Sequence, residues 1–153
     1  MDTREHDRKN LGFYRARLED SSVLYGIPMD TFDRAQNIQR LKNPNVFVFV
    51  SADDDAILVL EPAWGDVPWL CAHAWSSKAG RGRKLKRLFW AVYIWVFENT
   101  EYEVITGVVP ENLRYYKIFL GAIGAIRETE ILGTTVYSCN KTMVPEFKKK
   151  LEE

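Results

Sequence analysis

The sequence predicts a single mixed α/β domain over residues 1–153, with a sheet that contains both antiparallel and parallel strands. Two β-rich runs joined by Asp53-Asp54-Asp55 indicate an antiparallel hairpin. After the hairpin, strand-like segments alternate with helix-like ones, as in crossover connections between parallel strands. No internal repeat and no linker rich in Pro, Gly or Ser divides the 153 residues, so one domain is the economical interpretation.

The composition is that of a globular protein, with 46% hydrophobic, 13% aromatic and 27% charged residues. Lys+Arg and Asp+Glu number 21 each, so the whole molecule has no net field to attract nucleic acid or an anionic membrane. The N-terminus is charged and lacks the apolar core of a signal peptide, and the longest apolar run, 88–97, is about half a membrane span. We therefore expect a cytoplasmic protein with no membrane partner.

The chain has two cysteines, Cys71 and Cys139, and two histidines, His6 and His73. Their spacing matches no zinc-binding pattern, so we expect no metal site. Buried free thiols are the expected state of the cysteines in a reducing compartment, and a disulfide between them is the alternative.

The first part of the chain is expected to form one helix between short strands. Residues 1–10 are predicted to be a loose, polar lead-in, and the alternation over 11–18 suits a short strand better than a helix. Apolar residues recur at helical spacing over 30–41, after Asp30 and before a proline. The hairpin strands are predicted at 45–51 and 56–61.

The next strand is predicted at 67–75, where the large or soft side chains of Trp69, Cys71, His73 and Trp75 alternate with smaller ones. A small-residue loop leads to a helix at 83–99 that is almost wholly apolar after its first turn, as expected for a helix packed on a sheet. Its rings are predicted to form core, with a dimer face as the alternative: Phe89, Trp90, Tyr93, Trp95 and Phe97.

The last part of the chain is predicted to contain a strand at 103–109 and a helix at 110–120 with proline at its start. A late strand at 134–139 is then followed by a charged C-terminal helix.

Three segments of the chain carry a resemblance to a known family. They are Arg81-Gly82 at the start of the 83–99 helix, the Trp95-to-Thr100 segment, and Ile105-Thr-Gly-Val-Val-Pro110-Glu111-Asn112. Together, over residues 45–140, they resemble the GNAT acyltransferases, especially the small forms encoded by bacteriophages. The resemblance implies a mostly antiparallel central sheet with a splayed parallel strand pair, flanked by helices. It also implies an acyl-CoA-dependent N-acyltransferase, with acetyl-CoA as cofactor and direct attack by a small-molecule or protein amine.

The same resemblance assigns residues to a coenzyme A site. Arg81, Gly82, Arg83 and Lys84 would hold the pyrophosphate, which suits the free N–H groups and positive dipole of a helix N-terminus. Backbone groups of the splayed strand at Cys71, Ala72 and His73 would polarise the thioester carbonyl, and Asn112 and Phe119 would contact the cofactor from the later segment. The chain departs from the family pattern at Lys84 and Lys86, which replace small residues.

Three side chains are candidates for proton transfer. His73 would lie beside the acyl group, and an ordinary histidine titrates in the range a general base needs. Glu61, at the end of the preceding strand, is the second candidate base. Many family members place a proton-donating tyrosine where this chain has Phe119 or Leu120, so Tyr116 or its neighbour Tyr115 is the substitute. For His73 and Glu61, packing or solvent exposure is the competing interpretation.

Two other interpretations stay open. The substituted glycines and the missing tyrosine also fit an inactive GNAT-like module that binds coenzyme A or a phage or host protein. The six basic residues over 78–87 suit cofactor phosphates, a solvated helix start or, least well, a nucleic acid backbone. Three tryptophans flank the site and suit either an acceptor pocket or plain packing: Trp64, Trp69 and Trp75.

Overall fold

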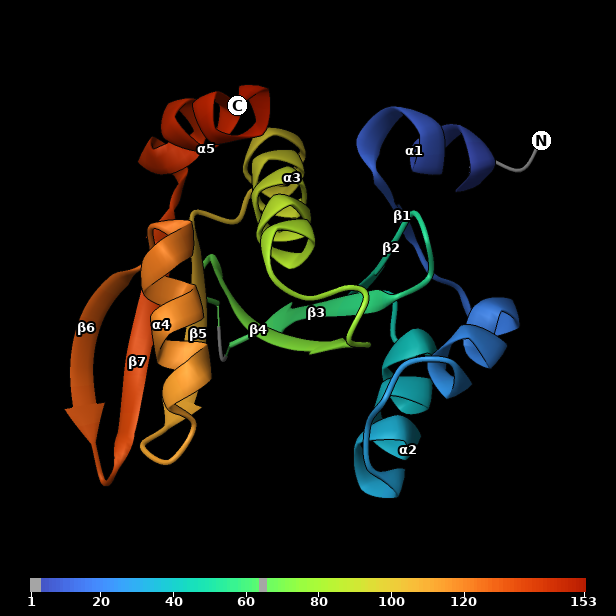
Figure 1. The fold of residues 1–153 in the computed structure, drawn as a ribbon, viewed down its shortest axis with the longest axis horizontal. Helices are drawn as coiled ribbons and strands as arrows, with labels where there is room; N and C mark the ends of the chain where they lie inside the picture. The colour runs from blue at the N-terminus through green and yellow to red at the C-terminus, as the bar shows by residue number, and fades with distance from the viewer. Residues whose placement is uncertain (1–3, 64–65) are drawn as a thin grey trace.

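The computed structural model describes residues 4–63 and 66–153. Within them, seven strands form one sheet in the order β1-β2-β3-β4-β5-β7-β6 (Figure 1). Only β4 and β5 pair in parallel, so the predicted mixed and mostly antiparallel sheet is confirmed. The strands are β1 Phe13–Arg15, β2 Phe47–Ser51, β3 Ala56–Pro62, β4 Trp69–Ser76, β5 Val104–Pro110, β6 Ile126–Ile131 and β7 Thr134–Asn140.

Helices flank both faces of the sheet (Figure 1). They are α1 Arg4–Leu11, the 3-10 helix η1 Leu18–Tyr25, α2 Thr31–Leu41, α3 Arg83–Asn99, α4 Arg114–Ile123, the 3-10 helix η2 Lys141–Met143 and α5 Val144–Glu152. None of those described is both long and apolar enough to span a bilayer. The predictions of α2, of the β2–β3 hairpin and of α3 are confirmed.

Three local predictions were wrong. Residues 4–10 belong to helix α1 and are not a loose lead-in. Pro110 ends β5, so the helix after it begins four residues later, at Arg114. Strand β6, which pairs with β7 at the edge of the sheet, was not predicted, because its six residues are all exposed and carry no burial alternation.

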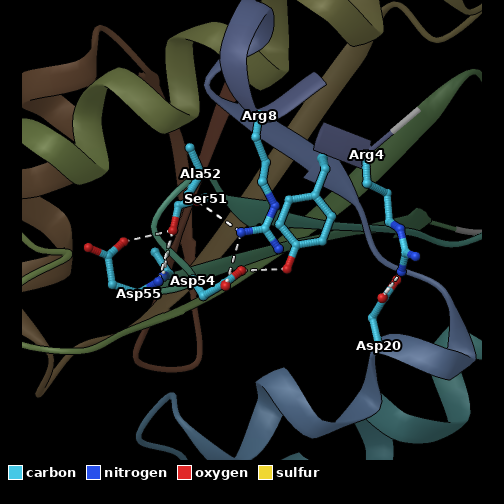
Figure 2. Close-up of polar contacts among 9 residues, drawn as sticks. Arg4, Arg8, Asp20, Ser51, Ala52, Asp54 and Asp55 are labelled. Carbon is cyan, nitrogen blue, oxygen red and sulfur yellow. Dashed lines mark hydrogen bonds and ion pairs between the residues drawn. The ribbon is translucent and has the colours of Figure 1, made fainter. Parts of the chain in front are cut away.

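Helix α1 buries none of its side chains and is held by charge instead. Arg4 forms an ion pair with Asp20, and Arg8 lies 3.1 Å from Asp54 (Figure 2). The Arg8 guanidinium also stacks over the ring of Tyr14. The Tyr14 hydroxyl donates to Asp54. Burial, with help from Asp54, raises the pKa of Tyr14, so this hydroxyl keeps its proton. These contacts attach α1 to η1 through Arg4 and to the β2–β3 turn through Arg8.

Alternate residues of the β2–β3 hairpin pack into two hydrophobic cores, one on each face of the sheet. Leu58 and Leu60 of β3 pack with α3, α4 and α5, whereas Ile57 and Val59 pack with η1 and α2. The α3 rings lie in the first of these cores, where Trp90 donates its Nε1–H to the Ile123 carbonyl at 2.9 Å. The prediction that these rings are core is confirmed for the four buried ones, and Trp95 is partly buried against the same core. Their use as a dimer face stays an alternative prediction.

Candidate active site

A gap opens between β4 and β5, the two parallel strands. Their pairing covers only Trp69 to Cys71 on β4, and it ends where Cys71 faces Thr106. Beyond this point β4 stays paired with β3 as far as Ser76, while β5 stays paired with β7 as far as Pro110. The two strands therefore diverge, and their facing edges lack the strand pairing that would satisfy backbone N–H and C=O groups.

A cleft of about 250 Å³ occupies this gap. Its apolar wall comes from α3 and α4 and includes Leu85, Phe89 and Phe119. Phe119 is 6% exposed and its ring lies 5.0 Å from that of Phe89, centroid to centroid. His73 and Tyr116 add polar groups to the lining. The cleft thus combines an apolar channel with a small number of polar side chains, as ligand sites usually do.

Four of the predicted cofactor and catalytic residues line the cleft: Ala72, His73, Tyr116 and Phe119. Cys71 is half-buried at the last β4 position that pairs with β5, and Asn112 is exposed ahead of α4; neither contributes to the lining. Glu61 and residues 81–84 also lie outside the lining. Trp75 does line the cleft, and its Nε1–H donates to Asp33 at 3.3 Å. Trp69 is 37% exposed and outside the lining, and Trp64 falls outside the described residues.

Gly82 precedes the first turn of α3 with φ 68° and ψ −135°, a conformation that essentially only glycine adopts. A Cβ atom placed on it would meet no other atom within 4 Å, so the space in front of the helix is open. The first turn of α3 contains no acidic residue. Its free N–H groups and positive dipole therefore remain suited to an anion.

The basic residues around Gly82 fall into two groups. Lys84 lies 2.6 Å from Asp53 and also pairs with Asp55, and Arg83 donates to the Glu153 carbonyl at 2.8 Å. The hydrogen bonds to Asp53 and Asp55 raise the pKa of Lys84. By contrast, the side chains of Lys78, Arg81 and Lys86 have no hydrogen-bond or ion-pair partner among the described residues. Of the four residues predicted to hold the pyrophosphate, Arg81 and Gly82 are available to contact it. Arg83 and Lys84 instead contact oxygens of the protein itself.

Asp55 fixes the loop that leads to α3. Its carbonyl accepts the Ser77 N–H at 2.8 Å, and its side chain accepts the Ser51 hydroxyl at 2.7 Å (Figure 2). A Cβ on Gly80 would lie 2.4 Å from the Asp55 carbonyl oxygen, so only glycine permits this approach. Burial acts to raise the pKa of Asp55, but hydrogen bonds from Lys84 and Ser51 outweigh it and lower that pKa. The sequence alone predicts only a turn at these aspartates.

Within the cleft lining, His73 belongs to a polar chain. Its Nε2 lies 2.9 Å from Glu61 Oε1, and Arg40 of α2 places Nη2 3.1 Å from the same oxygen. Arg40 also donates to Asn37 at 2.8 Å, and Asn37 is fully buried. Burial acts to raise the pKa of Glu61, but the hydrogen bond and charge of Arg40, together with His73, outweigh burial. The net effect is that the pKa of Glu61 is lowered.

Because Glu61 is ionised, it acts as an acceptor toward the imidazole, so Nε2 of a neutral His73 carries the proton. The Nδ1 lone pair is then available to accept another proton. His73 and Glu61 were each predicted from the sequence, but Arg40 and Asn37 were not. A signal for these two existed in their spacing with Asp33, since positions 33, 37 and 40 share one face of a helix.

No protein-family model matches the chain, and no curated protein matches it in sequence. Solved structures do match. FdhC, described as a nucleotide-linked sugar GNAT, aligns over 92% of both chains with a TM-score of 0.71 and 15% identity. RimJ from Mycobacterium smegmatis in complex with CoA-disulfide aligns over 92% of this chain and 87% of its own, with a TM-score of 0.67 and 13% identity.

A mutant of the spermidine N-acetyltransferase SpeG from Vibrio cholerae also aligns, over 86% of this chain and 94% of its own, with a TM-score of 0.65 and 12% identity. At such low identity these similarities concern the fold alone. They show that the chain has the GNAT fold, which confirms the fold class that its motifs implied.

Proposed function

We propose that this chain, which has the GNAT fold, is an N-acyltransferase that uses acetyl-CoA to acetylate an amine by direct attack. The observation that carries the proposal is the cleft between the diverging strands β4 and β5, which His73 lines while its imidazole contacts the ionised Glu61 outside the lining. An apolar channel that ends at a hydrogen-bonded base is suited to bringing an activated acyl donor and an amine together.

The residues present fit coenzyme A. The apolar wall formed by Phe89 and Phe119 suits the pantetheine arm, and the free edges of β4 and β5 offer backbone donors and acceptors. At α3, the open space before Gly82 and the free Arg81 and Lys86 suit the phosphates. When bound, acetyl-CoA supplies the activated thioester. The neighbour RimJ was solved with CoA-disulfide, which supports this assignment.

The polar side chains that line the cleft, and those that contact them, each have a task in this proposal. His73 Nδ1 accepts the proton of the attacking amine, and Glu61 holds the ring in the required tautomer. Arg40 keeps Glu61 ionised and in place. Tyr116 lines the cleft from α4 and donates its phenolic proton to the leaving group. Cys71 has no nucleophilic task, and burial raises its pKa away from the reactive thiolate form.

Calorimetry and thiol release test the proposal in two steps. Acetyl-CoA is expected to bind with micromolar affinity, and a panel of amines, including spermidine, aromatic monoamines and peptide N-termini, is expected to contain at least one acceptor that releases thiol. The Gly82→Trp variant fills the approach to α3 and should abolish the heat of binding. An absence of heat with millimolar acetyl-CoA would contradict both the enzyme and the cofactor site.

A second candidate is an inactive module that binds coenzyme A or a phage or host protein. The observation that favours it is the engagement of Arg83 and Lys84 with the chain's own oxygens. The module predicts cofactor binding with no thiol release for any acceptor.

Nucleic acid binding by the basic 78–87 segment is less well supported. Arg83 and Lys84 contact the chain's own oxygens, and Arg87 donates a hydrogen bond to the Leu151 carbonyl. Half of the six basic side chains are therefore unavailable to nucleic acid.

The proposal also includes a cytoplasmic location and a bacteriophage source. Both Cys71 and Cys139 are free thiols, the state that a reducing cytoplasm maintains. The motif resemblance to small bacteriophage members supports a phage source.

A further inference from the structure

The two edges of the sheet differ in their protection. Edge strand β1 has three residues, two of them buried, and α1 packs beside it. Edge strand β6 has six residues, all exposed, and no described segment pairs with its outer side (Figure 1). An unpaired edge of this length is a template for another strand.

A β-bulge at Glu128 sets which side chains of β6 share a face. Arg127 faces Tyr137 and Glu130 faces Thr135, two positions apart on β7, so Arg127 and Glu130 point to the same face. Ile126 faces Ser138 and Ile131 faces Thr134, four positions apart, so the isoleucines share the opposite face. Without the bulge, each of these two pairs would be split between the faces.

The bulge therefore makes the strand symmetric about its centre. If a second β6 lies antiparallel to the first with a two-fold axis at residues 128–129, Ile126 of each copy faces Ile131 of the other. In the same arrangement Arg127 of each copy faces Glu130 of the other. Each opposing pair then lies on one face of the joined sheet, and opposite charges meet twice.

We propose that the partner of this edge is a second copy of the chain, paired through β6 into one continuous sheet. Charges on an edge strand ordinarily prevent pairing, because copies in most registers bring like charges together. In the two-fold register of this strand, each Arg127 instead faces a Glu130 of the other copy, so opposite charges are paired. Ile126 and Ile131, 46% and 56% exposed, would bury apolar surface there. The proposal does not depend on the acyltransferase activity.

Charge swaps test the two-fold register. The full chain is expected to dimerise in sedimentation equilibrium. Arg127→Glu gives Glu opposite Glu, and Glu130→Arg gives Arg opposite Arg, so each variant alone should raise the dimer dissociation constant roughly tenfold or more. An equimolar mixture of the two variants restores both opposite-charge pairs and should form a heterodimer as tight as the wild-type dimer. Lys149→Glu, an exposed change of the same charge on α5, is the matched control.

The mixture separates the interface from effects on folding. Each single variant also breaks the ion pair between Arg127 and Glu130 within one chain, but only an interface between copies can be rescued by mixing. Circular dichroism of each single variant should match the wild type. A wild-type chain that stays monomeric at every concentration, single variants that still dimerise like the wild type, or a mixture that stays monomeric would each overturn the proposal.

Discussion

The two ends of the candidate site, the start of α3 and the polar chain beside β4, are built in different ways. At the α3 end, the main features are backbone geometry: the positive φ of Gly82, the free N–H groups of the first turn and the close approach of Gly80 to Asp55. At the β4 end, the main features are side chains that come from three elements, His73, Glu61 and Arg40. Substitutions should therefore act on binding at the first end and on proton transfer at the second.

The largest effect is expected at the proton-transfer end. His73→Ala removes the proposed base and should lower kcat about 10²- to 10⁴-fold, while the dissociation constant for acetyl-CoA changes little. Steady-state kinetics and calorimetry on the same preparation measure the two quantities. His6→Ala, a change at the exposed histidine of α1, is the matched control. An equal loss of affinity in His73→Ala would mean that the two ends are not separable.

At the binding end, Gly82→Ala should reverse this pattern. An alanine at φ 68° and ψ −135° costs about 1–3 kcal/mol or moves the helix start, so acetyl-CoA affinity should fall roughly tenfold or more. Saturated kcat should be nearly unchanged. Gly121→Ala is the matched control, since Gly121 has no positive φ and no atom within 4 Å of a Cβ. The interpretation fails if both glycines tolerate alanine equally.

Arg40→Leu tests the side-chain end through stability. The pKa of Glu61 is lowered in the folded state. Its contribution to the free energy of unfolding is therefore fully present above the pKa of the unfolded chain, about 4.3, and is lost as the pH falls through the folded-state pKa. The variant should therefore lose about 1–3 kcal/mol of unfolding free energy at neutral pH. Urea titrations should show this difference narrow as the pH falls below about 4.

Arg17→Leu is the control for that experiment, since its ion pair with Glu19 is more than half exposed and should matter little. A difference between Arg40→Leu and wild type that stays constant across the acid range would show that Arg40 acts by packing and not by charge.

The smallest effects should separate the two groups of basic residues at α3. Arg81→Met removes a cation with no partner in the described chain and should weaken acetyl-CoA binding severalfold, more so at low salt. Lys84→Met removes a cation that Asp53 and Asp55 already neutralise and should change binding less. Calorimetry at two salt concentrations measures both. The reverse order would show that Lys84 leaves its carboxylates when the cofactor binds.

The sequence predicted the features that depend on neighbours along the chain. Helix α3 was placed at its observed bounds because a glycine precedes it and apolar residues continue through it. Helix α1 was missed because its stability comes from Asp20 and Asp54, which lie far along the chain. Strand β6 was missed because exposure on both faces removes the alternation that marks a strand.

The candidate site divides in the same way. The Arg81-Gly82 turn was recognisable because a local motif sets its backbone, whereas the engagement of Lys84 depends on a turn about thirty residues earlier. His73 and Glu61 could be named from their strands, but their contact and the role of Arg40 follow from the register of β3 with β4 and from the packing of α2. Such contacts are tertiary, so one sequence read alone does not contain them.

The point where β4 and β5 part also gives the molecule a chemical reporter. Cys71 lies at that point, half-buried, whereas burial raises the pKa of Cys139 to about 12 and keeps it protonated. An alkylating reagent should therefore modify one thiol slowly and leave the other intact. A ligand that fills the gap beside Cys71 should slow this single reaction further, so the rate of alkylation measures occupancy of the cleft without any knowledge of the acceptor.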